Sequence, residues 1–259
     1  MVLPEVTLNS IHTAYTFCEV SQLLSQLNPD AVIFFDVDDT LITPESKLFR
    51  YASPYRFLID DLKKNRQHYP NFEAILSHWR LERRTMLLSP EWPDLIQDLK
   101  ARFDVFALTK METGSLGKIP SMEEWRYKEL KSKGITFTPH FQNLSETLLV
   151  KENAEDNPST FYRGIFITGS FPKNRVVREV LKGSHSKQVV LIDDRLEHLQ
   201  DVEKECLKHN LPFLGIHFKG MEHISGQPDL KVGEFQKISL LERCHWIEDD
   251  EAERLLKQA

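Results

Sequence analysis

Two apolar stretches of the chain end in clusters of carboxylates. Residues 31–35 are Ala-Val-Ile-Phe-Phe, and residues 189–192 are Val-Val-Leu-Ile. The acids that follow them are Asp36, Asp38 and Asp39 in the first case, and Asp193 and Asp194 in the second. Grouped carboxylates at the end of a buried strand raise the free energy of the folded state unless a cation lies among them. The pattern therefore predicts a cation-dependent site, and the alternative for the first cluster is a solvated acidic turn.

Strand-like apolar stretches alternate with amphipathic helix-like stretches. We expect strands at residues 31–35, 104–109, 164–169, 189–194 and 212–217, and helices at residues 21–27, 92–101, 121–133, 174–181 and 195–209. Unbroken apolar runs are typical of strands buried on both faces of a parallel sheet. Strand–helix alternation predicts an α/β fold with a doubly wound, mainly parallel sheet, whose ligands bind at the carboxyl ends of the strands. Residues 137–161 are less regular and are predicted to be an excursion, with a hairpin as the alternative.

Residues 43–92 interrupt this alternation. Their apolar residues have helical spacing, at Tyr55, Leu58, Ile59 and Leu62, and again at Phe72, Ile75, Leu76 and Trp79. The sequence thus predicts a helical insert, residues 43–92, standing over the end of the first strand. The core would consist of residues 1–42 and 93–259.

The composition favours a globular enzyme. Hydrophobic residues make up 41% of the 259 residues and charged residues 28%, and the formal net charge of −6 gives no overall basic footprint for nucleic acid. The three cysteines, Cys18, Cys206 and Cys244, lie far apart, which favours a reducing compartment over a disulfide or zinc framework. No segment reaches the length of a membrane span, and the first residues do not form a signal peptide. We therefore expect a cytoplasmic protein; export by a route that reads no N-terminal signal stays open.

In chain order, the polar strand ends resemble the four motifs of the haloacid dehalogenase (HAD) superfamily, a Rossmann-like group dominated by magnesium-dependent phosphatases. The matching residues are Asp36-Val37-Asp38-Asp39-Thr40 for the D-x-D-x-T motif, Thr109 for the strand-ending hydroxyl, Lys173 for the lysine that opens a helix, and Asp193-Asp194 for the final acid pair. The resemblance covers residues 30–218. In finer detail, at Gly134-Ile135 and residues 164–173, the chain is similar to uncharacterised bacterial HAD-like proteins without an assigned substrate. The resemblance implies a Rossmann-like (HAD) sheet with a small helical cap insert.

The resemblance also implies roles for individual residues. Asp36 would attack phosphorus and form an aspartyl-phosphate, while Asp38 would protonate the leaving oxygen and then activate water. The role of Asp38 as an acid needs a raised pKa, which partial burial and neighbouring carboxylates would favour. Thr109 would donate to the phosphoryl oxygens, and Lys173 would neutralise charge on Asp36 and on the transferring group.

Magnesium is the implied cofactor, because it prefers carboxylates, carbonyls and water as ligands. Its ligands would be Asp36, the backbone carbonyl of Asp38, and Asp194 with Asp193 nearby. Asp39 stands at the variable position of its motif and is expected to be a turn residue.

Several of these residues have competing interpretations. Thr109 could cap the turn that follows its strand, and Lys173 could be a solvated lysine at a helix start. Lys182 and Lys187 also precede the fourth strand and are rival candidates for the active-site lysine. Asp193 and Asp194 could cap the helix at residues 195–209.

The insert is rich in arginine, whose guanidinium suits bidentate contacts to phosphate or carboxylate. The arginines considered for such contacts are Arg50, Arg56, Arg80, Arg83 and Arg84. Arg80, Arg83 and Arg84 have the spacing of helix neighbours and could together contact the distal part of a substrate. The alternative is a solvated basic helix face.

These observations predict a HAD-type phosphatase, that is, a magnesium-dependent hydrolase of a small phosphorylated substrate. A dehalogenase is disfavoured because that branch lacks the second acid, here Asp38. Two alternatives stay open: a phosphotransferase with the same intermediate, and a non-catalytic binding or effector protein built on the HAD scaffold. The sequence predicts no nucleic-acid or membrane partner, and it does not indicate an oligomeric state.

Overall fold

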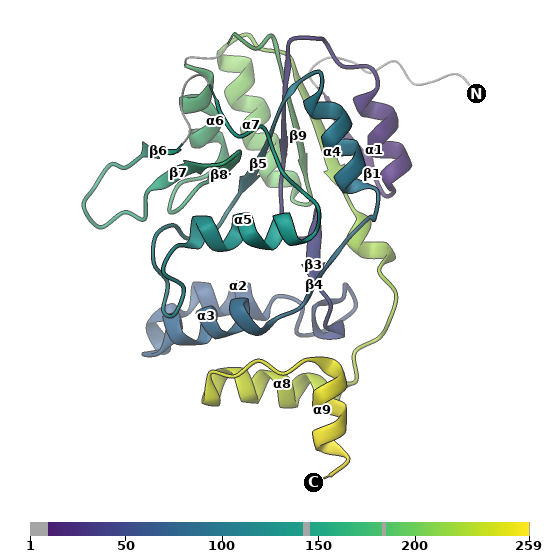
Figure 1. Cartoon of the computed structure of the whole chain (residues 1–259), viewed down its shortest axis with the longest axis vertical. Coiled ribbons are helices and arrows are strands. Elements are labelled where there is room, and N and C mark those ends of the chain that lie inside the picture. The colour runs from purple at the N-terminus through teal and green to yellow at the C-terminus, as the bar shows by residue number, and fades with distance from the viewer. Residues whose placement is uncertain (1–9, 142–145, 183–184, 259) are drawn as a thin grey trace.

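The computed structural model describes residues 10–141, 146–182 and 185–258. Its centre is an eight-stranded sheet with the strand order β1-β10-β9-β2-β5-β8-β7-β6 (Figure 1). The pairs from β1 to β8 in this order are parallel, whereas β7 and β6 are antiparallel to their neighbours. The strands are β1 (Ser10–Ala14), β2 (Ala31–Phe35), β5 (Asp104–Thr109), β6 (Glu146–Val150), β7 (Ser159–Tyr162), β8 (Ile165–Ile167), β9 (Gln188–Asp193) and β10 (Phe213–Phe218). The predicted α/β class with a mainly parallel sheet is confirmed.

Helices cover both faces of this sheet. Ile33 and Phe35 of β2 point into a core with one set of helices, α1 (Phe17–Leu24), α4 (Trp92–Lys100) and α5 (Met122–Ser132). Val32 and Phe34 point into the opposite core, with α6 (Lys173–Leu181) and α7 (Leu196–Lys208). All five residues of β2 are buried, as expected for a strand covered on both faces.

The order of the strands reverses between β2 and β9. From β2 the chain moves outward to β5 and β8 on one side, and it then returns to form β9 and β10 on the other. Such a switch point leaves a crevice at the carboxyl ends of the two central strands. Both carboxylate clusters of the sequence lie at this edge, because Asp36 directly follows β2 and Asp193 ends β9.

The five predicted strands coincide with β2, β5, β8, β9 and β10 to within a few residues. The sequence did not indicate β1, whose residues Ser-Ile-His-Thr-Ala are mixed in polarity and form an edge strand. Within residues 137–161, β6 and β7 form the antiparallel hairpin that was the alternative interpretation; residues 142–145 lie outside the described part. Helix α1 begins at Phe17 rather than at residue 21 because Thr16 and Glu19 form a capping box.

The insert begins and ends in a two-stranded antiparallel ribbon, β3 (Ile42–Pro44) and β4 (Thr85–Leu87). Between these strands lie η1 (Lys47–Phe49), α2 (Leu58–Lys64), η2 (Arg66–His68) and α3 (Phe72–Glu82). The segment is helical, as its periodicity indicates. The division of the chain into a core and a cap stays a prediction.

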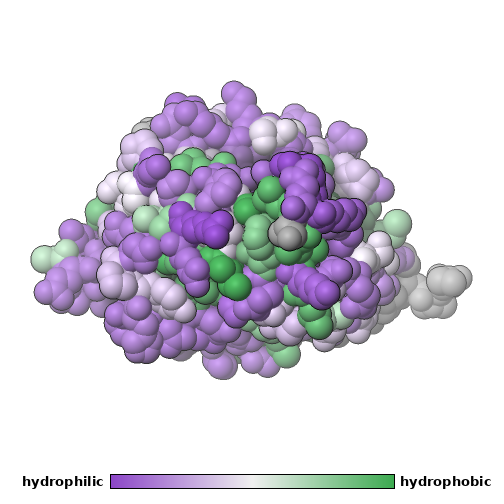
Figure 2. All heavy atoms as spheres, turned by 90° about the horizontal axis from the view of Figure 1, so that it is seen from below, coloured by the Kyte–Doolittle hydropathy of each residue, from purple (hydrophilic) through white to green (hydrophobic). Residues whose placement is uncertain are grey.

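The C-terminal part of the chain lies against the insert rather than against the sheet (Figure 1). It comprises α8 (Leu230–Arg243) and α9 (Asp249–Leu256), whereas η3 (Gly220–His223) precedes them beside the end of β1, where His223 contacts Tyr15. Asp249 accepts a hydrogen bond from Ser46 Oγ at 2.6 Å, and Glu82 accepts one from the Trp246 backbone amide at 2.7 Å. Seen from this end, apolar side chains are interspersed with hydrophilic ones (Figure 2). Within the described residues, no helix is both long and apolar enough to cross a bilayer.

Candidate active site

Strand pairing brings the two acidic clusters side by side. Phe35 of β2 pairs with Ile192 of β9, and the Asp36 amide donates to the Ile192 carbonyl at 2.8 Å. The next residues along both strands are therefore neighbours at the switch point. Asp36 is only 6% exposed and Asp193 is fully buried.

Lys173 lies between the two clusters. It is the first residue of α6, it is 2% exposed, and its Nζ lies 2.6 Å from Asp36 Oδ1 and 2.6 Å from Asp193 Oδ2. Burial alone would lower the pKa of Lys173, but the carboxylates of Asp193 and Asp36 raise that pKa above its ordinary value. Lys173 thus carries its charge inside the protein and neutralises part of the acidic cluster.

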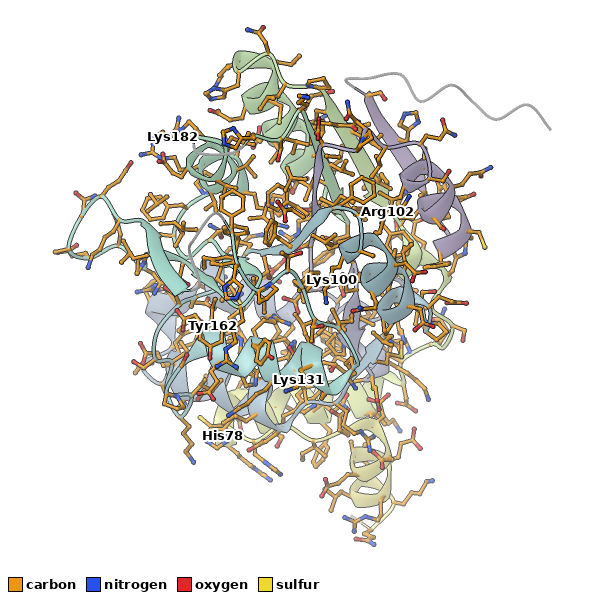
Figure 3. All side chains as sticks on the ribbon, turned by 45° about the horizontal axis from the view of Figure 1, so that its top comes forward. His78, Lys100, Arg102, Lys131, Tyr162 and Lys182 are labelled. Atoms are coloured by element: carbon orange, nitrogen blue, oxygen red, sulfur yellow. The ribbon has the colours of Figure 1, made fainter. Side chains whose placement is uncertain are left out.

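The rival lysines lie elsewhere. Lys182 follows α6 at the surface of the molecule (Figure 3), and its Nζ pairs with Glu179 at 2.6 Å. Lys187 pairs with Asp30 at 2.7 Å, at the opposite end of β2. Among the three candidates, the structure brings only Lys173 to the acids.

Asp36, Asp193 and Asp194 have carboxylate oxygens that all lie within 4.8 Å of one another. Burial raises the pKa of Asp36 to about 6, with Asp193 and Asp38 adding to the effect and Lys173 opposing it. Burial and the carboxylates of Asp36, Asp39 and Asp193 hold the pKa of Asp194 well above its ordinary value. Carboxylate crowding of this kind is relieved by a divalent cation, and an all-oxygen donor set suits Mg²⁺.

Asp193 already has several protein partners. Besides Lys173, its carboxylate accepts the Arg195 backbone amide at 2.9 Å and lies 3.2 Å from His198 Nδ1. Arg195 is the N-cap residue of α7 and, among the described residues, the helix has no side-chain cap, so the alternative that Asp193 or Asp194 caps this helix is wrong. Asp36 and Asp194 are therefore the carboxylates best placed to bind a cation directly, with Asp193 as the acid that fixes Lys173.

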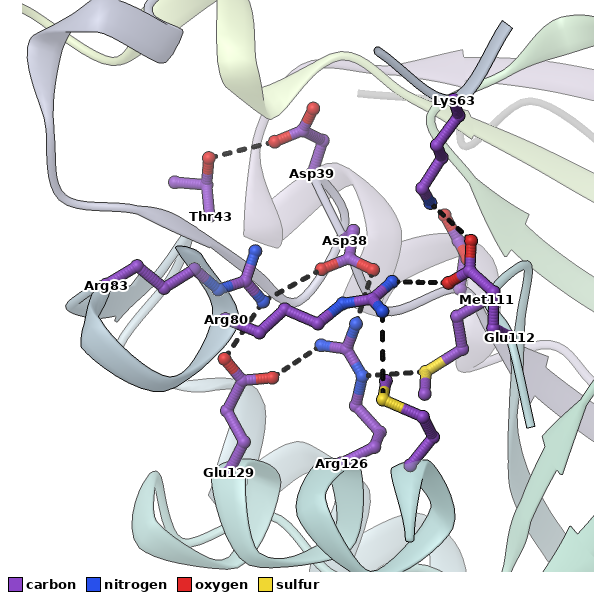
Figure 4. A network of polar contacts seen from close by, with 12 residues as sticks. Asp38, Asp39, Thr43, Lys63, Arg80, Arg83, Met111, Glu112, Arg126 and Glu129 are labelled. Atoms are coloured by element: carbon purple, nitrogen blue, oxygen red, sulfur yellow. Dashed lines mark hydrogen bonds and ion pairs between the residues drawn. The ribbon is translucent and has the colours of Figure 1, made fainter. Parts of the chain in front are cut away.

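Asp38 lies in a different environment from its neighbours (Figure 4). Its carboxylate accepts from Arg126 Nη2 at 2.6 Å and lies 3.5 Å from Arg83 Nη2, and Glu129 contacts both guanidinium groups at 2.6 and 3.0 Å. Its side chain is nevertheless 44% exposed, so it lies in a recess that is open to solvent.

The expectation of a raised pKa for Asp38 is wrong in this structure. Loss of hydration around the carboxylate would raise that pKa. Arg126 and Arg83 more than offset this effect and hold the pKa well below its ordinary value. The sequence argument took account of burial and of nearby carboxylates, but it could not place Arg126, which lies 88 residues away along the chain.

The hydroxyl residues of the site lie where the sequence places them. Thr109 is the last residue of β5 and is 1% exposed. Thr40 was not assigned a role, yet its hydroxyl is buried and has no hydrogen-bond partner in the described part of the chain. Asp39 has φ of 60° and accepts from Thr43 Oγ1 at 2.8 Å, as expected of a turn residue.

The insert arginines have different environments. The side chains of Arg80 and Arg83 are each 3% exposed, and Arg80 Nη2 lies 2.6 Å from Glu112 Oε2. Arg84 is 53% exposed and pairs with Asp250 at 2.8 Å. Arg84 is therefore solvated, but it lies in the link between α3 and β4 rather than on a helix face, whereas Arg80 and Arg83 contact residues of the core. The sequence reasoning missed the partners Arg126 and Glu129, because the charged helix α5 has the composition of a surface helix, and it missed Glu112, which lies in the loop after β5.

The carboxylates of the candidate site (Asp36, Asp38, Asp193 and Asp194) do not line the cavity at the opposite edge of the sheet. That cavity, of about 540 Å³, is lined by Asp30, Lys100, Arg102 and Asp104, which lie near the beginnings of β2 and β5 (Figure 3). At the carboxyl ends of the strands, Arg80, Arg83 and Arg126 lie beside Asp38 instead (Figure 4).

The fold and the polar strand ends define an α/β protein with a mainly parallel sheet and a carboxylate–lysine cluster at its switch point. The chain belongs to the family described as "Protein of unknown function (DUF2608)", which matches residues 13–253. It is 26% identical over 243 residues to an uncharacterised protein of Rickettsia prowazekii (strain Madrid E), covering 92% of this chain and 88% of that protein. Among solved structures, it is similar to a candidate haloacid dehalogenase-like hydrolase from Burkholderia xenovorans LB400, with 12% identity, a TM-score of 0.33, and 68% and 77% of the two chains covered.

Proposed function

We propose that the protein is a magnesium-dependent phosphomonoester hydrolase of the HAD type, with Asp36 as the nucleophile. The observation that carries this proposal is the ion pair of Asp36 with buried Lys173, beside Asp194, at the switch point of the sheet. A carboxylate nucleophile and an anionic phosphate repel each other, and cations on both sides of the carboxylate reduce this repulsion.

The reaction has two displacements at phosphorus. In the first, an Asp36 carboxylate oxygen forms a bond to phosphorus while the bond from phosphorus to the ester oxygen breaks, and Asp38 gives its proton to that oxygen, which leaves an aspartyl-phosphate and an alcohol. In the second, water attacks phosphorus and gives a proton to Asp38, the bond to Asp36 breaks, and inorganic phosphate leaves. Bound Mg²⁺ would supply additional positive charge at the phosphoryl oxygens.

Asp38 is the general acid/base in this proposal. Its carboxylate is held by Arg126 and Arg83, yet it is open enough for water and a leaving group to reach it. Its two guanidinium partners lower its pKa and make it a weaker base than a free carboxylate, so proton transfer to Asp38 from the attacking water requires these contacts to loosen during the reaction. Thr109, at the end of β5, would donate to a phosphoryl oxygen.

The test is turnover of nitrophenyl phosphate with and without Mg²⁺. We expect Mg²⁺-dependent release of phosphate from the wild-type protein and loss of nearly all turnover in Asp36→Asn. The matched control is Asp30→Asn, which changes an exposed acid at the other end of β2. Turnover of more than a few per cent in Asp36→Asn would contradict the assigned nucleophile.

The same experiment separates the two alternatives. In the presence of an added alcohol, a phosphotransferase would give a phosphorylated alcohol in place of inorganic phosphate. A protein that binds Mg²⁺ but turns over neither the aryl ester nor phosphorylated metabolites would be a binding or effector protein.

A further inference from the structure

Two cationic side chains contact a single carboxylate next to the proposed active site, and a third cationic residue lies close by in the sequence. Arg80 of α3 lies 2.6 Å from Glu112 Oε2, and Lys63 of α2 lies 3.7 Å from Glu112 Oε1 (Figure 4). Lys110 lies two residues before Glu112 and directly after Thr109. Its Nζ donates to the carbonyls of Gly169 and Phe171, at 3.3 and 2.7 Å, in the segment that leads to Lys173.

The charges of this group do not balance among the described residues. In the described part of the chain, Glu112 is the one carboxylate within 4 Å of either Arg80 or Lys63, and the acceptors of Lys110 are uncharged carbonyls. The carboxylates of Asp38 and Asp60 act on Lys63 only from further away. Lys63 and Lys110 are also close enough to affect each other: partial burial lowers the pKa of Lys110, and Lys63 lowers it further. An excess of cations at this position favours binding of an anion from solution.

Lys63 is the cation of this group with the most freedom to bind a ligand. Its contact with Glu112 is long, Arg80 contacts the same carboxylate more closely, and 30% of the Lys63 side chain is exposed. Lys63 also lies in the same network of polar side chains as Asp38, beside the catalytic recess (Figure 4). Lys110 is exposed too, at the end of the strand that carries Thr109.

We propose that Lys63, with Lys110 beside it, forms a subsite for a second anionic group of the substrate. The substrate class is then a small phosphomonoester whose far end carries a carboxylate or a second phosphate. This inference rests on the proposed phosphatase function, because the phosphate that is cleaved must lie at Asp36.

Lys63 also has a purely structural alternative, since a lysine in the last turn of a helix stabilises the helix dipole. Lys64 occupies the same turn, is exposed and shares this role. Lys64→Gln is therefore the matched control for Lys63→Gln, and Lys63→Arg restores the charge.

The experiment compares kcat/KM for three esters: glycerol phosphate, phosphoglycerate and glycerol bisphosphate. Their far ends are a hydroxymethyl group, a carboxylate and a second phosphate. We expect the wild-type protein to prefer one or both of the anionic esters by about tenfold or more, the size of one charge-assisted contact. Lys63→Gln should lose this preference through KM while its activity on glycerol phosphate stays within about twofold, and Lys63→Arg should retain it.

Equal kcat/KM values for the three esters in the wild-type protein would overturn the subsite, as would equal losses on all three in Lys63→Gln. Absence of any turnover, including that of nitrophenyl phosphate, would instead contradict the proposed phosphatase. In that case the three compounds are compared as ligands of the wild-type protein by calorimetry. Tighter binding of an anionic ester that is lost in Lys63→Gln, but not in Lys64→Gln, would support the subsite, and equal binding would overturn it.

Discussion

The guanidinium of Arg126 donates a hydrogen bond to Asp38 Oδ2 at 2.6 Å and thereby joins α5 to the loop after β2. Arg126 is 1% exposed, and Glu129, almost one turn further along the helix, fixes its other Nη atom. Arg83 reaches the same carboxylate from the insert. Asp38 is thus held at once by a core helix and by the insert, which makes its position depend on how the insert packs.

The first prediction concerns this contact. Arg126→Gln should reduce kcat by about tenfold or more and lower the free energy of unfolding by about 1–3 kcal/mol, because it removes charge-assisted hydrogen bonds from a buried position. Turnover assays and urea denaturation measure the two effects. Arg84→Gln is the control: its exposed ion pairs should contribute at most about 1 kcal/mol. Unchanged kcat in Arg126→Gln would show that Arg126 does not position Asp38 for catalysis.

The second prediction concerns the metal. Mg²⁺ should stabilise the folded protein by mass action, by about 2.7 kcal/mol at a free concentration of about 100 Kd. Asp194→Asn should abolish most of this stabilisation, because it removes one of the two carboxylates best placed to bind the cation. Calorimetry and thermal melts with and without Mg²⁺ provide the measurement. Asp201→Asn changes an exposed acid of α7 and should leave Mg²⁺ binding unaltered; equal Mg²⁺ affinity in both variants would contradict the site.

The third prediction concerns pH and stability. Burial would raise the pKa of Glu112, but Lys63 and Arg80 lower it to about 2 from an ordinary value of 4.5. Because the folded-state pKa is depressed, this carboxylate stabilises the fold above pH 4.5, and the contribution is lost as the pH falls from 4.5 to about 2. After allowance for partial exposure of the side chain, the contribution amounts to about 1–3 kcal/mol.

Denaturation of wild-type and Glu112→Gln proteins tests this dependence. The wild-type protein should be more stable at neutral pH, and the difference should shrink as the pH falls below about 4.5. A difference that stays constant from neutral pH to pH 3 would show that the charge of Glu112 is not responsible.

The fourth prediction concerns the attachment of the C-terminal helices. Asp249 accepts hydrogen bonds from Ser46 Oγ, the Lys47 amide and Gln236 Nε2, at 2.6, 2.9 and 2.9 Å. Asp249→Ala should therefore lower the free energy of unfolding by about 1–3 kcal/mol. The neighbouring variant Asp250→Ala removes one exposed ion pair and should cost at most about 1 kcal/mol. Equal effects of the two substitutions would contradict a special role for Asp249.

The central strands could be predicted from the sequence because short, unbroken apolar runs are typical of strands that are buried on both faces of a sheet. β2 and β9 are of this kind, and the acids that follow them already indicated the edge of the sheet where they meet. β1 gave no such signal, since an edge strand is paired on one side only and tolerates Ser10, His12 and Thr13. The position of a residue in a buried strand depends on the pattern of its neighbours in the chain, so it can be predicted from the sequence.

The surroundings of Asp38 could not be predicted in the same way. α5 has the residues Met-Glu-Glu-Trp-Arg-Tyr-Lys-Glu-Leu-Lys-Ser, a composition typical of a solvated helix. Its Arg126 is nevertheless buried, because Asp38, Glu129 and the thioether of Met111 provide its partners. Such pairing depends on contacts between distant segments, which neither periodicity nor spacing reports.

The position of α8 and α9 beneath the insert has a consequence for the order in which the protein is made. The ribosome releases residues 43–92 well before Trp246 and Asp249, whose contacts attach the C-terminal helices to Glu82 and Ser46. During synthesis the sheet can form, with all the acids at its strand ends in place, before α8 and α9 pack against the insert. A chain whose translation stops after β10 would thus carry every carboxylate of the candidate site but not the helices that support the insert above them.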